Sequence, residues 1–133
     1  MTELVLDTHA LIWYLASSPR LSHTAAQAIR DAISRGHRLA ISAISLAEVL
    51  YLEEKGRFLP GTLAAIRTEL QAPGTALEEA PLSGDVVDAM RRVPRDKVPD
   101  MPDRVVAATA VHLGVPLVTE DAMIHASGIP VIW

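Results

Sequence analysis

The chain has 133 residues, 50% of them hydrophobic, with 12 basic and 16 acidic side chains and a formal net charge of −4. This length and this share of apolar residues suit one compact domain with a real core, and they argue against an intrinsically disordered chain. The acidic balance argues against a protein that holds nucleic acid by being basic overall, and the absence of cysteine excludes disulfides, thiolate nucleophiles and Cys-ligated zinc.

Short apolar runs and helical patterns alternate along the chain. Apolar runs without polar alternation predict strands buried on both faces at 4–6, 39–41 and 116–118. A weaker strand is expected at 76–80, nearer an edge of the sheet, and a last short strand at 131–132. Apolar residues at helical spacing, with Ser, Pro or Gly at the ends, predict helices over 8–16, 22–35, 43–55, 60–71, 83–92, 103–113 and 121–125. The stretch 93–102 is rich in proline and is predicted to be a loop.

Strands that alternate with helices imply right-handed βαβ crossovers. We therefore predict an α/β fold, a three-layer α/β/α sandwich with a central, mainly parallel sheet. No internal repeat or linker is visible, so a single domain over residues 1–133 is expected. The longest apolar run, 10–16, is far shorter than the roughly 20 residues of a membrane helix, and no signal-like segment opens the chain. These features predict a cytoplasmic protein without membrane contact.

Four acidic residues stand at particular places in this scheme. Asp7 follows the first strand, and Asp121 follows the run Leu117-Val118-Thr119. Glu48 lies just inside the helix after the second strand, and Asp103 opens the alanine-rich helix. In an open parallel sheet all strands end at one edge, which is the edge where ligands bind. The four carboxylates are therefore expected to meet there.

Each acid also has an ordinary structural explanation. Asp7 and Asp121 can be helix N-caps, which the helix dipole favours. Ser45 and Glu48 match the capping box S-x-x-E, and Asp100 and Asp103 together can cap the next helix. Taken one at a time, the acids are more simply explained as caps. Taken together, at positions that share one sheet edge, they favour a functional site.

The predicted surroundings of Glu48 require compensation of its charge. Its helical neighbours include Ile44, Tyr51 and Leu52, and an unpaired charge on so apolar a face is costly. Two carboxylates about 4 Å apart repel by roughly 4 kcal/mol at an effective dielectric constant of about 20, so protons or a cation must bind where four meet. Oxygen ligands without cysteine or paired histidines favour Mg²⁺ or Mn²⁺ over zinc. Such an ion suits attack on a phosphodiester.

Three segments carry a resemblance to a known family: LDTHALIW, SAISLAEVLYL and DMPDRVVAATAVHLGVPLVTED. In this order and spacing they resemble the PIN domain family, and specifically the small VapC-type toxins of bacterial toxin–antitoxin pairs, over essentially the full chain. The resemblance implies a quartet that coordinates Mg²⁺ or Mn²⁺ for endonucleolytic cleavage of RNA, formed by Asp7, Glu48, Asp103 and Asp121. Thr119 matches the family's hydroxyl residue beside the last acid. The family also implies a homodimer and a cognate VapB-type antitoxin that blocks the site.

Several other residues have two interpretations. Arg104 can contact phosphate or brace the acids, although a surface salt bridge is an equal alternative. The basic run 91–97 can guide RNA, but such runs are more often solvated faces. His9 lies two residues from Asp7 and can approach a substrate, yet a helix-surface role is the simpler interpretation. The aromatic residues are too scattered in the sequence for a base-stacking platform and are expected in the core or an interface: Trp13, Tyr14, Tyr51, Phe58 and Trp133.

A metal-dependent ribonuclease toxin is the leading hypothesis, and two other classes remain open. A non-catalytic PIN-like module would use the same fold to hold RNA or a protein partner. A phosphatase of the haloacid dehalogenase type also begins with an acid after a strand. Such enzymes have the motif Asp-x-Asp at that point, whereas residue 9 of this chain is His. The chain contains no Gly-rich phosphate loop and no G-x-S-x-G motif, which disfavours P-loop enzymes and serine hydrolases.

Overall fold

The computed structural model describes residues 1–133 and contains a five-stranded sheet with the strand order β3-β2-β1-β4-β5. Every neighbouring pair of strands is parallel. The strands are β1 (Thr2–Leu6), β2 (Arg38–Ser42), β3 (Leu77–Ala80), β4 (Leu117–Val118) and β5 (Val131–Ile132). The prediction of a parallel sheet is confirmed, and the weak strand at 77–80 lies at an edge as expected.

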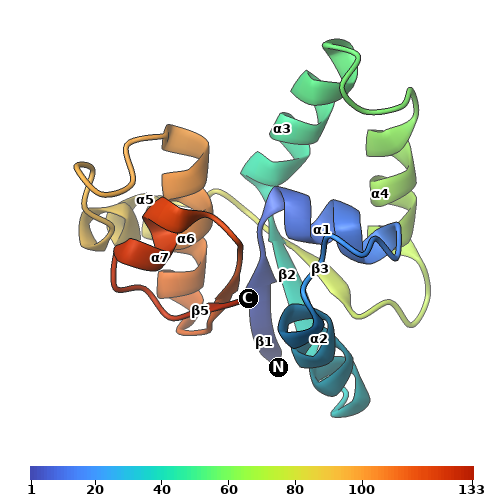
Figure 1. Cartoon of the computed structure of the whole chain (residues 1–133), viewed down its shortest axis with the longest axis horizontal. Coiled ribbons are helices and arrows are strands. Elements are labelled where there is room, and N and C mark those ends of the chain that lie inside the picture. Colours follow the sequence, from blue (N-terminus) through green and yellow to red (C-terminus); the bar gives the residue numbers. More distant parts are fainter.

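Helices cover both faces of this sheet (Figure 1). Helices α1, α2 and α4 lie on one side of the sheet and α5, α6 and α7 on the other, while α3 starts at the end of β2 and extends beyond the sheet (Figure 1). Their bounds are α1 (Thr8–Leu15), α2 (His23–Ser34), α3 (Ala43–Glu54), α4 (Thr62–Gln71), α5 (Gly84–Ala89), α6 (Met101–Leu113) and α7 (Ala122–Ala126), with a 3₁₀ turn η1 (Met90–Arg92) after α5. The predicted three-layer α/β/α architecture is confirmed. None of these helices combines the length and the hydropathy that crossing a membrane requires.

The central strand β1 is buried from both sides. Leu4 and Leu6 belong to the apolar core shared with α1, α2 and α4, whereas Val5 belongs to the core shared with α5, α6 and α7. Val5 and Leu6 have no exposed surface. Because both faces of the strand meet apolar helices, the run needs no polar alternation, which is the physical reason for the pattern seen in the sequence.

The register of the sheet determines where the chain leaves it. Leu6 of β1 lies opposite Val118 of β4, so the residues that follow, Asp7 and Thr119, emerge side by side at the carboxyl ends of the two strands. The backbone N–H of Asp7 donates to the carbonyl of Val118 across 3.1 Å, which extends the ladder by one residue. This pairing fixes the relative position of the first and last predicted acids.

Two helices start two residues away from the predicted position. Helix α6 begins at Met101, so Pro102 lies in its first turn instead of the predicted loop. A proline is tolerated there because the first N–H groups of a helix have no partner within the helix. Helix α4 begins at Thr62 instead of Pro60, because Gly61 has a left-handed backbone (φ 91°) that the helix cannot include.

Candidate functional site

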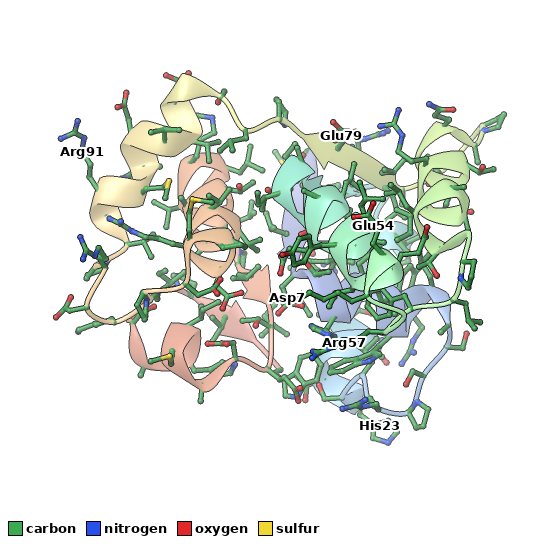
Figure 2. The ribbon with its side chains drawn as sticks, turned by 90° about the horizontal axis from the view of Figure 1, so that it is seen from above. Asp7, His23, Glu54, Arg57, Glu79 and Arg91 are labelled. Carbon is green, nitrogen blue, oxygen red and sulfur yellow. The ribbon has the colours of Figure 1, made fainter.

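All four predicted acids line one cavity of about 340 Å³ at the carboxyl ends of the central strands. Seen from above, Asp7 lies near the middle of the molecule, between the two groups of helices (Figure 2). The lining contains a fifth carboxylate, Glu120, and further residues of mixed character, namely Thr8, His9, Val106 and Ile124. The structure therefore brings together side chains from four segments that are far apart in the sequence.

Asp7 is the N-cap of α1. Its side chain accepts a hydrogen bond of 2.8 Å from the backbone N–H of Ala10. One carboxylate oxygen thus stabilises the start of the helix, and the same residue lines the cavity. The capping interpretation and the site interpretation are both compatible with this position.

Asp121 occupies the matching position at α7, where its side chain accepts a hydrogen bond of 2.9 Å from the N–H of Ile124. The N–H of Asp121 donates to the hydroxyl of Thr119, which is fully buried. Hydrogen bonding by the Thr119 side chain also opposes the rise of the pKa of Asp7. Thr119 therefore interacts with both acids without lining the cavity itself.

Glu48 lies inside α3 and does not form the capping box considered from the sequence. The N-cap of α3 is Ser42, whose hydroxyl accepts from the N–H of Ile44. Ser45 is fully buried, and its Oγ lies 2.9 Å from Oγ1 of Thr8, which in turn lies 2.8 Å from Oε1 of Glu48. A hydroxyl has one proton to give, so Thr8 donates to Glu48 and accepts from Ser45. The compensation expected for Glu48 thus comes in part from α1.

Asp103 lies in the first turn of α6 but does not cap it. The cap is Asp100, whose side chain accepts a hydrogen bond of 3.0 Å from the N–H of Asp103. The idea that both acids cap this helix is therefore wrong for Asp103. Its carboxylate lines the cavity instead.

The crowding of negative charge has its largest effect on Asp103. Burial raises the pKa of Asp103, and the neighbouring carboxylates raise it further to about 7, in the order Asp100, Asp121, Glu48 and Asp7. Each of these charges disfavours ionisation of the next, because like charges in a partly desolvated cavity repel. Asp103 is therefore the group in this cavity most affected by the others.

The pKa values of Asp7 and Glu48 are raised, like that of Asp103. Burial raises the pKa of Asp7, and the charge of Asp121 adds to that effect, while hydrogen bonds from Thr119 and Ala10 oppose it. Burial also raises the pKa of Glu48, the charges of Asp100 and Asp7 add to it, and the hydrogen bond from Thr8 opposes it. Ionised carboxylates in this cavity are therefore stabilised incompletely, and a cation would relieve the repulsion.

The donor set fits a hard divalent cation in its chemistry, since it offers five carboxylates and a hydroxyl beside a single imidazole and no sulfur. The distances are a separate matter. No group of three or more His, Asp or Glu side chains is arranged closely enough to share an ion. The acids therefore line one cavity without forming a preassembled coordination shell.

Arg104 makes neither the salt bridge nor the brace to the acids considered from the sequence. Its guanidinium donates to two backbone carbonyls, from Nε to Val93 (2.8 Å) and from one terminal nitrogen to Met90 (2.9 Å). Arg104 therefore ties α6 to the segment around η1. Arg91, at the start of the basic run, lies at the outer edge of the molecule, away from Asp7 (Figure 2).

Three of the aromatic residues, Trp13, Phe58 and Trp133, form a chain of ring contacts with His9. Trp13 is 7% exposed, as expected of a core residue, whereas Tyr51 is 61% exposed. The ring of Trp13 lies 5.6 Å from the ring of His9 and 5.7 Å from that of Trp133, and the ring of Phe58 lies 6.4 Å from His9. The sequence interpretation also gave no site role to Thr8 or Glu120, although both line the cavity. Their position directly beside Asp7 and Asp121 was the available signal.

A parallel α/β sandwich with an acidic cavity at the carboxyl ends of its central strands defines a class of α/β domains with a carboxylate-rich site. Within this class the chain belongs to the PIN domain family, whose sequence profile matches residues 4–128. It is similar to Ribonuclease VapC22 of Mycobacterium tuberculosis, with 31% identity over 126 residues that cover 95% of this chain and 92% of that protein.

Solved structures share the fold over nearly the whole chain. VapBC2 from Rickettsia felis, bound to a DNA fragment from its promoter, matches with a TM-score of 0.70 and 16% identity, covering 98% of this chain and 96% of the matched one. DNA-bound VapBC from Salmonella typhimurium gives a TM-score of 0.68 at 21% identity, covering 98% and 97%. A toxin–antitoxin complex from Klebsiella pneumoniae gives 0.67 at 24% identity, again covering 98% and 97%.

Proposed function

We propose that this protein is a metal-dependent endoribonuclease, the toxin of a VapBC-type toxin–antitoxin pair. The observation that carries the proposal is the shared cavity of Asp7, Glu48, Asp103 and Asp121, which come from four separate segments and raise one another's pKa where a shift is resolved. Similarity to a ribonuclease over 95% of the chain supports it. Perturbed acids in a cleft are typical of catalytic and metal sites.

The four acids would hold Mg²⁺ or Mn²⁺, with Thr119 and Thr8 orienting the carboxylates. Such an ion, when bound, neutralises negative charge that grows on the phosphate oxygens and activates water for attack on the phosphodiester. Asp103 would release its proton when a cation binds, because burial and the neighbouring carboxylates raise its pKa and a cation nearby offsets both effects. Since no three acids now stand around one point, cation binding requires some of these side chains to turn inward.

The proposed partners follow from the family and from the relatives. RNA is the proposed substrate, a VapB-type antitoxin the proposed inhibitor, and a homodimer the proposed assembly, in the cytoplasm. Two of the matched structures are named as VapBC complexes, which supports an antitoxin partner. Arg104 has no direct part in this mechanism, because its guanidinium is engaged by backbone carbonyls.

A cleavage assay with the Asp7→Asn variant tests the proposal. Asn is as good an N-cap as Asp, so this variant keeps the helix start and loses only the charge. We expect the wild-type protein to cut mixed RNA with Mg²⁺ or Mn²⁺ and not with chelator, and Asp7→Asn to lose at least about 100-fold in rate, as removal of electrostatic catalytic groups usually does. Circular dichroism would confirm that the variant is folded.

The alternative is a non-catalytic PIN-like module that binds RNA or a protein. The separation of the acids favours it, since they do not already surround a common point. RNA that binds the protein but stays intact with either ion would support this alternative. Equal cleavage rates for Asp7→Asn and the wild type would remove Asp7 from the mechanism.

A further inference from the structure

His9 is the only aromatic ring among the residues that line the acidic cavity. The other polar lining residues are five carboxylates and Thr8. His9 lies in the first turn of α1 and its side chain is exposed, so solvent and ligands reach it. It lies two residues from Asp7 in the sequence and lines the same cavity.

Neighbouring rings hold His9 in place. Trp13 lies one turn further along α1, with its ring tilted by 46° to the imidazole at 5.6 Å, and Phe58 approaches edge-on at 69° and 6.4 Å from the segment between α3 and α4. Trp13 is itself fixed, because it is 7% exposed and contacts Trp133 and the guanidinium of Arg20. Neither neighbour stacks parallel on the imidazole, so a planar group can stack there.

The charge of the cavity restricts what such a ring can recognise. Five carboxylates repel the phosphates of an incoming nucleotide, so that nucleotide gains little from electrostatic attraction to the protein itself. A nucleobase offers a different contact, since stacking on an aromatic ring does not depend on the charge of the backbone. Single-stranded RNA exposes its bases for this kind of contact, whereas a duplex hides them.

We propose that His9 positions the substrate by stacking on a base of single-stranded RNA, next to the phosphodiester that is cut. This inference rests on the proposed ribonuclease function and adds to it the nucleotide contact at the mouth of the cavity. Trp13 and Phe58 would act through His9 by fixing the orientation of its ring. The RNA bound in this way is unpaired at the nucleotide beside the cleaved bond.

Four variants test this role. His9→Ala removes the ring, His9→Phe keeps an aromatic plane without ring nitrogens, and His9→Gln keeps hydrogen-bonding groups without the plane. His23→Ala is the matched control, because His23 is also an exposed histidine at the start of a helix but lies at the periphery of the molecule (Figure 2). Binding is measured with a fluorescent single-stranded oligoribonucleotide that the wild type cuts, in Mg²⁺ and in an Asp103→Asn background that prevents cleavage.

We expect His9→Ala and His9→Gln to weaken binding by about 5- to 150-fold, the equivalent of one base–aromatic stack. His9→Phe should restore binding to within about threefold of the unchanged protein, a difference well below one such stack. His23→Ala should have no effect. Unchanged binding of His9→Ala overturns the proposal, and so does recovery by His9→Gln but not by His9→Phe, which would indicate a hydrogen bond instead of a stack.

Kinetics on the active protein separate this proposal from the proposed function. A contact made equally in the ground state and the transition state raises KM and leaves kcat nearly unchanged, and His9→Ala should show this split. If the wild type cuts RNA and His9→Ala has the same KM and the same affinity for RNA as the wild type, only the proposed role of His9 is contradicted. If the wild type cuts no RNA with Mg²⁺ or Mn²⁺, the ribonuclease function fails.

Discussion

Asp103 is the residue on which the charges of the cavity act most strongly. Its carboxylate is not needed for capping, since Asp100 has that role, and its pKa is raised from 3.8 to about 7. A carboxyl group in water is ionised at neutral pH, whereas the folded chain disfavours the ionised form of Asp103. Ionised Asp103 therefore lowers the stability of the folded chain, a cost that is common at functional sites.

The pH dependence of stability follows from that shift. Below about pH 4 the carboxyl group is protonated in both the folded and the unfolded chain. As the pH rises from about 4 to about 7, the unfolded chain loses this proton before the folded chain does, so the free energy of unfolding falls. The destabilisation by Asp103 reaches its full size above the pKa of the folded state. Asp103→Asn should remove this slope.

We therefore expect Asp103→Asn to be more stable than the wild type at pH 8, by a gain on the order of 1 kcal/mol, because solvent screens part of the repulsion at this partly buried side chain. The difference should shrink toward pH 4. Urea unfolding at several pH values measures it. A variant that is less stable than the wild type at pH 8 would show that the helix dipole's attraction for Asp103 exceeds the repulsion.

At the scale of elements, short polar contacts join helices that surround the cavity. The hydroxyl of Thr8 connects α1 to Glu48 and Ser45 of α3. On the other side, Arg104 connects α6 to the carbonyls of Met90 and Val93. Each contact joins an element that carries a candidate ligand to a neighbour, so the cavity is held by its walls as well as by the sheet.

Substitution of Thr8 tests the contact between α1 and α3. Thr8→Val keeps the shape of the side chain but leaves the buried Ser45 hydroxyl and Glu48 without this partner, which should lower the free energy of unfolding by about 1 to 3 kcal/mol. It should also raise the pKa of Glu48 further, because the hydrogen bond from Thr8 opposes the effect of burial. Thr8→Ser keeps the hydroxyl and serves as the control. Chemical denaturation compares the two, and equal stability would mean that this contact contributes nothing.

At the scale of the whole molecule, a bound cation should stabilise the fold. A ligand that binds only the folded state at about 100 times its Kd adds roughly 2.7 kcal/mol to the free energy of unfolding. For a chain of this size we expect Tm to rise by about 5 to 15 °C in saturating Mg²⁺ or Mn²⁺. The rise should disappear in Asp7→Asn and persist in Asp85→Asn, which changes an exposed acid in α5. An unchanged Tm of the wild type would contradict cation binding at this site.

The sequence predicts this architecture well wherever the information is local. Unalternating runs such as Leu4-Val5-Leu6 identify buried strands, and parallel topology then places Asp7 and Asp121 at one edge without knowledge of the exact strand order. Asp103 and Glu48 required the further assumption that their helices start at that edge, which the shared cavity bears out in position. Their catalytic and metal-binding roles stay predictions.

Contacts between distant segments could not be predicted in this way. The pairing of Thr8 with Glu48 and the group of rings around His9 depend on how α1 sits against α3 and on the path of the chain near Phe58 and Trp133. Periodicity describes which face of an element is apolar and carries no information about which neighbour covers it. The same limit applies to Arg104, for which the sequence indicates phosphate, the acids or a surface salt bridge as partners, whereas the structure shows the carbonyls of Met90 and Val93.

The pairing of β1 with β4 has a consequence for the order of events during synthesis. The first strand is the centre of the sheet, yet one of its two neighbours is made more than a hundred residues later, at Leu117 and Val118. Until that neighbour emerges from the ribosome, Asp7 has no Val118 carbonyl to bind and the cavity has no Asp121. Under the proposed ribonuclease function, the chain would therefore stay inactive until the segment that carries Asp121 has been made, which would leave time for an inhibitor to be present first.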